Sequence, residues 1–132
     1  MELYADFRNE YKFLDFSLSH SQLLLRSMRN NDRDYNIDIL FKGVSIILLP
    51  TILRGIKISL FEISNTGGSI KKYGFETGDE RKIFNIENVE RKVYYINAYA
   101  LGIFHNELEI LETSIGRYDY NQPGEKILWY NG

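Results

Sequence analysis

The segment from Asn36 to Pro50 constrains the fold more than any other part of the chain, because its apolar residues alternate and change phase once. Alternate residues of a strand point to the same face of a sheet. A two-residue turn at Lys42-Gly43 would pair the two halves of the segment and place six apolar side chains on one face. The pairs would be Phe41 with Val44, Ile39 with Ile46 and Ile37 with Leu48. The sequence therefore predicts an antiparallel hairpin in a β-rich core.

The rest of the chain predicts more short strands separated by turn residues. The expected strands are residues 14–18, 23–26, 56–61, 70–76, 83–86, 93–104, 108–114 and 127–130. The first two would form a second hairpin, and the segment from Lys92 to Phe104 is either one long strand or two strands split near Ala98–Ala100. This spacing of strands and turns is typical of an antiparallel sandwich or a partly open barrel.

One helix is expected, at the N-terminus. Its apolar residues recur at helical spacing, namely Leu3, Tyr4, Phe7 and Tyr11. Glu2 and Asp6 lie early in the segment, where acidic side chains favour the first turn of a helix. The predicted fold class is therefore mainly β, all-β or α+β, with a short N-terminal helix.

Length and composition are those of one domain. The 132 residues are 44% hydrophobic and 14% aromatic, which is enough for one continuous core, so residues 1–132 are expected to form a single β-rich domain. The net charge of −2 gives no overall field that would attract nucleic acid or an anionic membrane. Without cysteine the chain has no disulfide, thiol nucleophile or Cys-ligated zinc.

Location and source are also expectations from composition. The N-terminus lacks the pattern of a secretory signal, and no apolar run approaches the ~20 residues that span a bilayer. A soluble, cytoplasmic protein is the default expectation. The frequent use of Ile, Asn, Lys and Tyr resembles the coding bias of an AT-rich bacterial genome, so we expect a bacterial source.

No motif in the sequence predicts catalysis, a cofactor or a metal. Ser19-His20-Ser21 places a base beside two hydroxyls, but neighbours in a strand point to opposite faces, which works against a Ser-His hydrogen bond, so a polar turn is expected. The spacing of His20 and His105, the two histidines, does not indicate a zinc site. The glycines of residues 66–72 lack P-loop spacing, and the acidic residues around Gly78 lack the EF-hand pattern.

The candidate binding residues lie near the C-terminus. Glu107, directly before the expected strand 108–114, and Glu109, two residues later, would point to the same face, with Glu112 close by. Such a cluster is either a solvated face or an electrostatic docking patch. Tyrosine is frequent in the same third of the chain, and exposed aromatic residues beside acids are typical of protein-binding surfaces. The predicted interface consists of Glu107, Glu109, Glu112, Tyr118, Asp119 and Tyr120.

The sequence thus favours a non-enzymatic protein that binds a macromolecular partner. An immunity or antitoxin-like inhibitor fits its size, acidity and expected bacterial source. The partner would be another protein, such as a basic toxin or enzyme, or a second copy of the chain, whereas nucleic acid and membranes are not expected. The alternative is a β-barrel or sandwich that binds a small apolar ligand in a void lined by aromatic residues. An enzyme ranks third.

Overall fold

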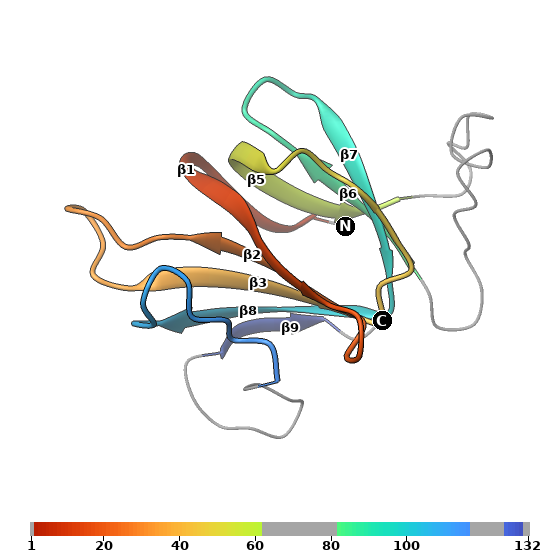
Figure 1. Ribbon diagram of the computed structural model, residues 1–132. Coiled ribbons are helices and arrows are strands. Elements are labelled where there is room, and N and C mark those ends of the chain that lie inside the picture. The colour runs from red at the N-terminus through yellow and green to blue at the C-terminus, as the bar shows by residue number, and fades with distance from the viewer. Residues whose placement is uncertain (1, 62–81, 117–125, 131–132) are drawn as a thin grey trace.

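The computed structural model describes residues 2–61, 82–116 and 126–130, and all the regular elements in these residues are β-strands (Figure 1). The strands are β1 (Glu2–Ser17), β2 (Gln22–Ser27), β3 (Asn36–Lys42), β4 (Ile46–Leu48), β5 (Ile52–Leu60), β6 (Lys82–Glu87), β7 (Val93–Ala98), β8 (Ala100–Asn106) and β9 (Lys126–Tyr130). They form one sheet with the order β4-β7-β6-β5-β1-β2-β3-β8-β9. Every neighbouring pair is antiparallel, so the prediction of a mainly β, antiparallel fold is confirmed.

Strand β1 lies at the centre of the sheet and belongs to both of its halves. Residues from Lys12 to Ser17 pair with β2, whereas residues from Glu2 to Lys12 pair with β5. The register shifts between Phe13 and Asp15 on one side and between Asp6 and Glu10 on the other. Such bulges bend a strand and increase its twist. The sheet consequently folds over, and its two halves face each other (Figure 1).

The hydrophobic core fills the space between the two halves. Phe41 of β3 meets Phe84 of β6 edge to face, with ring centroids 5.6 Å apart, although these strands are not neighbours in the sheet. The predicted inward face of Ile37, Ile39 and Phe41 is confirmed, since all three side chains are buried in this core. Strands from both halves contribute apolar side chains to the same cluster.

The predicted pairing across Lys42-Gly43 is wrong. The chain does turn there, with Gly43 at φ 65°, but β3 pairs with β2 and β8, and β4 pairs with β7. Only glycine fits, because a Cβ atom at this position would lie 2.1 Å from the ring of Tyr99. After the turn the chain crosses to the other half of the sheet, where the Ser45 N–H donates to the Asn97 carbonyl. The predicted inward position of Ile46 and Leu48 is also wrong, because Ile47 and Leu49 are the residues that pack against the core after Val44.

The predicted N-terminal helix is not shown, and Glu2–Ser17 form strand β1. The register shift between Asp6 and Glu10 changes the phase of the strand, so apolar residues need not keep a strict period of two. A spacing of three to four residues therefore does not distinguish a bulged strand from a helix.

Most other strand predictions are confirmed. Strands β1 and β2 form the second hairpin, the segment from Lys92 to Phe104 divides at Tyr99 into β7 and β8, and the expected strand 127–130 is part of β9. The expected strand 108–114 is wrong, since these residues form a turn and irregular structure outside the sheet. The expected strand 70–76 lies outside the described residues.

Candidate functional site

The outward face of β2, β3 and β8 carries a buried ion pair. Arg26 and Asp38 are cross-strand neighbours on β2 and β3, and their side chains are 1% and 0% exposed. Arg26 donates from Nε to Asp38 Oδ1 at 2.6 Å and from Nη2 to Oδ2 at 2.9 Å. Their neighbours Leu25 and Ile39 alternate with them and enter the core, so the ion pair lies on the opposite face of the sheet.

Two asparagines extend this ion pair into a network. Asn106 of β8 donates to Asp38 Oδ2 at 2.8 Å, and Asn36 of β3 donates to Asn106 Oδ1 at 2.9 Å. Both side chains are buried. A buried charge is tolerated only when further hydrogen bonds satisfy it, and this bidentate pair with an additional donor meets that requirement.

The network ends on the backbone that follows β8. Arg26 Nη1 donates to the carbonyl of Glu109 at 3.1 Å, and Asn36 Nδ2 donates to that of Leu108 at 2.8 Å. Arg29 Nη1 donates to the carbonyls of Glu107, at 2.7 Å, and Leu108, at 3.1 Å. Three successive carbonyls outside the sheet are therefore held by side chains from β2, β3 and the loop between them.

Residues 107–112, which we call the anchored turn, continue from these carbonyls. The Glu112 N–H donates to the Glu109 carbonyl at 3.0 Å, and Glu112 Oε1 accepts from the Glu109 N–H at 2.8 Å, which closes a β-turn. The two central residues, Ile110 and Leu111, are 53% and 84% exposed. Central turn positions usually hold Gly, Pro, Asn, Asp or Ser, so two large exposed apolar residues are unusual here.

The chain is fixed again immediately after the anchored turn. Ile115 packs on a small apolar cluster of Leu24, Leu40 and Phe104, which lies on the outward face of β2, β3 and β8. Ser114 is fully buried beside it in the sequence. The segment after β8 therefore covers this face of the sheet, and the anchored turn is held at both ends.

The predicted site residues are only partly brought together. Glu107, Glu109 and Glu112 are exposed and lie on the anchored turn, not on one face of a strand as expected. Tyr118, Asp119 and Tyr120 lie outside the described residues. The buried polar network and the exposed Ile110-Leu111 pair were missed. Arg26 and Asp38, which interrupt the apolar runs of β2 and β3, were the sequence signal for the network. Alternation alone, however, predicts that such residues face solvent.

The β1–β2 turn does bring serine and histidine together, contrary to the expectation from the sequence. His20 Nδ1 lies 2.9 Å from Ser17 Oγ and 3.3 Å from Ser19 Oγ, because these residues form a turn where neighbours need not diverge. In a Ser-His-Asp triad it is Nε2 that faces the nucleophile, whereas Nδ1 faces the acid. These exposed contacts match a polar turn and not a catalytic dyad.

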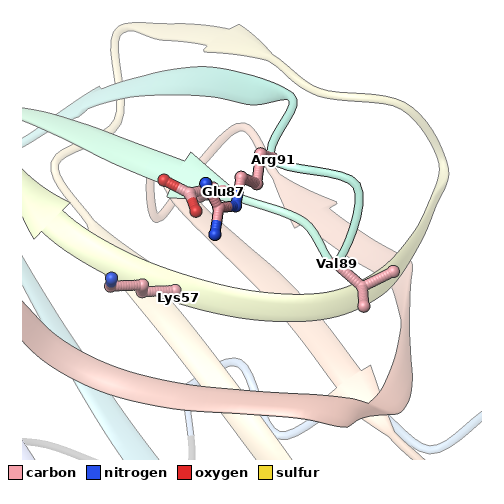
Figure 2. A pocket seen from close by; sticks show the side chains of 4 residues that line it. All are labelled: Lys57, Glu87, Val89 and Arg91. Atoms are coloured by element: carbon pink, nitrogen blue, oxygen red, sulfur yellow. The ribbon is translucent and has the colours of Figure 1, made fainter.

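A hollow of about 560 Å³ lies beside the turn between β6 and β7 (Figure 2). Its lining residues are Lys57, Glu87, Val89 and Arg91. Lys57 and Glu87 are cross-strand neighbours on β5 and β6. Pockets for apolar ligands are lined mainly by hydrophobic and aromatic side chains, whereas three of these four residues are charged. The hollow therefore gives no support to the apolar-ligand alternative.

The described residues contain neither a cluster of metal ligands nor a membrane-spanning helix. Within residues 2–61, 82–116 and 126–130, no group of three or more His, Cys, Asp or Glu side chains could hold a metal ion. His105 instead stacks on Tyr35 with ring centroids 3.9 Å apart. The described part of the chain contains no helix that could span a membrane.

The chain matches no protein-family model, and no curated protein or solved structure matches it. A function must therefore be argued from the geometry of the site.

Proposed function

We propose that this protein is a non-enzymatic binding protein that contacts another protein through the anchored turn. The observation that carries this proposal is the exposure of Ile110 and Leu111 on a backbone fixed by buried polar groups. Buried polar networks usually stabilise the interior of a domain. Here the network ends on the backbone of a turn whose central side chains point away from the core.

The energetics of association favour such an arrangement. Transfer of an exposed leucine side chain into a partner's apolar recess contributes about 1.5–3 kcal/mol. Ordering a flexible loop would cost roughly 1–2 kcal/mol for each backbone residue fixed. Because the carbonyls of Glu107, Leu108 and Glu109 are already held, most of that cost is met when the protein folds.

Within this class we favour a cytoplasmic inhibitor of the immunity or antitoxin kind. The acidity of the chain supports this choice, as does an amino-acid usage that resembles that of an AT-rich bacterial genome. Such inhibitors need a rigid surface and no reactive group, and the anchored turn provides the first of these.

Two leucines with the same exposure allow a matched test. Leu111 in the anchored turn and Leu18 in the β1–β2 turn are each 84% exposed. Tagged wild-type protein, Leu111→Ser and Leu18→Ser would each be used for affinity capture from a lysate of the source cells. We expect one stoichiometric protein partner with the wild type and Leu18→Ser, and its loss with Leu111→Ser. Equal capture by the two variants, or capture of no protein, would contradict the proposal.

A further inference from the structure

The loop between β2 and β3 lies at the same end of the sheet as the anchored turn (Figure 1). Arg29 of this loop joins the two segments, since it holds two carbonyls of the turn and lies 3.5 Å from the Glu109 carboxylate. Asp32 and Asp34 of the loop are exposed. Arg29 therefore joins the two segments into one surface, and both segments carry exposed carboxylates.

The charge of this surface differs from that of the remaining chain. Residues 26–38 and 107–112 contain six carboxylates and three arginines, so their formal charge is 3 − 6 = −3. The whole chain carries −2, which leaves +1 for all other residues.

The arginines of this surface are committed to internal contacts. Arg26 is buried against Asp38. Arg33 donates to the Tyr35 carbonyl and to Ser27 Oγ, and its guanidinium lies 5.4 Å from the ring centroid of Tyr35. Arg26 is paired with Asp38 and Arg29 lies beside Glu109, so four other carboxylates stand against Arg33 and the net charge at this end of the molecule is negative.

From this geometry we infer that the partner is a basic protein, with an apolar recess that takes Leu111 and a rim of Lys or Arg side chains that meets Glu107, Glu109 and Glu112. This inference rests on the proposed function and names the class of partner. An acidic rim around an apolar anchor is complementary to a basic rim around an apolar recess. Nucleic acid is disfavoured, because its phosphates would face a surface with a formal charge of −3.

The apolar anchor and the acidic rim would act on different rate constants. Rim charges steer the encounter, so they set the association rate and its dependence on salt. A buried anchor mainly sets the dissociation rate. Leu111→Ser should therefore raise the dissociation rate about tenfold or more. Glu107→Gln with Glu109→Gln should lower the association rate about tenfold at low salt, and the difference should shrink at high salt.

The first step of the test is site-specific photocrosslinking with the full chain. The photoreactive amino acid p-benzoylphenylalanine would replace Leu111, or Leu18 as the matched control, and each protein would be irradiated in a lysate of the source cells. Mass spectrometry would identify the crosslinked molecule and the crosslinked segment. We expect a protein that crosslinks at position 111 well above the control, through a segment rich in Lys and Arg.

The second step measures association of the crosslinked partner, purified, with two double variants. Glu107→Gln with Glu109→Gln removes two charges from the anchored turn. Glu10→Gln with Glu90→Gln removes two exposed charges elsewhere, with Glu10 on the part of β1 that pairs with β5 and Glu90 in the turn between β6 and β7. We expect only the first pair to slow association at low salt.

The possible failures are distinguishable. If a protein crosslinks at position 111 through a neutral or acidic segment, or associates equally fast with both double variants, the partner is not the basic protein inferred and the proposed function stands. If crosslinking at position 111 does not exceed that at position 18, or joins nucleic acid, both the inference and the proposed function are wrong.

Discussion

The two faces of β2, β3 and β8 use the same three strands in different ways. The inward face is apolar and packs against the other half of the sheet, with Ile39 and Phe41 among its buried residues. The outward face combines a small apolar cluster with the Arg26–Asp38 network, and an irregular segment covers it. The inward face holds the domain together by hydrophobic burial, which is strong but not directional. Directional hydrogen bonds on the outward face determine where residues 107–112 lie.

The strongest test of this comparison is a charge introduced into the inward face. Ile39→Asp would bury an unpaired carboxylate in the core and should destabilise the protein by at least ~4 kcal/mol, which is most of the stability of a domain at the low end of the usual range. Ile46→Asp should cost much less, because Ile46 is only half-buried on the three-residue strand β4. Urea unfolding followed by circular dichroism would measure both. Equal losses would show that β4 is as central to the core as β3, as the pairing predicted from the sequence required.

A second test separates two roles of the Arg26–Asp38 pair, its contribution to stability and its role in positioning the anchored turn. Asp38→Ala leaves the Arg26 guanidinium buried without its carboxylate and should cost about 3–5 kcal/mol. The double variant Arg26→Met with Asp38→Leu should recover most of this loss, since well-packed apolar residues often replace a buried ion pair at no cost. It should nevertheless release the anchored turn, because the hydrogen bond to the Glu109 carbonyl is lost.

The readouts for this pair of variants are urea unfolding and hydrogen exchange at the Glu112 amide, which donates to the Glu109 carbonyl. Faster exchange in a double variant of normal stability would support a positioning role for the network. Unchanged exchange there would show that the turn holds its shape without the ion pair.

The sequence predicted the two faces unequally, for physical reasons. Alternation identified the inward face of β3 correctly, because burial depends on local periodicity. It could not identify the neighbours of β3, which depend on contacts with residues distant in the sequence. Asp38 alternates with apolar residues as a solvent-facing residue would, but it is buried, paired with Arg26 and hydrogen-bonded by Asn106, which lies far away in the sequence. The same alternation presented Ile110 as part of a strand, although a hydrogen-bonded turn determines its position.

Substitution of Asn106 tests how much the uncharged asparagines of the network contribute to stability. Its side chain donates to Asp38 and accepts from Asn36, so Asn106→Ala should cost about 1–3 kcal/mol by leaving buried polar groups unsatisfied. Asn85→Ala is a matched control, because Asn85 donates a 3.2 Å hydrogen bond to Ser59 Oγ while its Oδ1 has no partner among the described residues. The control should lose less stability than Asn106→Ala in thermal unfolding. A larger loss in the control would mean that the network adds little to the stability of the outward face.

The smallest expected effect concerns the side chains at the centre of the anchored turn. Ile110→Ser with Leu111→Ser should change the free energy of unfolding by no more than about 0.5 kcal/mol, since both side chains are exposed and the backbone bonds that hold the turn do not involve them. Leu18→Ser, in the other exposed turn, should behave in the same way. Urea unfolding of the three proteins would check this. A loss above about 1 kcal/mol confined to the anchored turn would mean that Ile110 and Leu111 pack within the molecule, and the reason for assigning them to a partner would disappear.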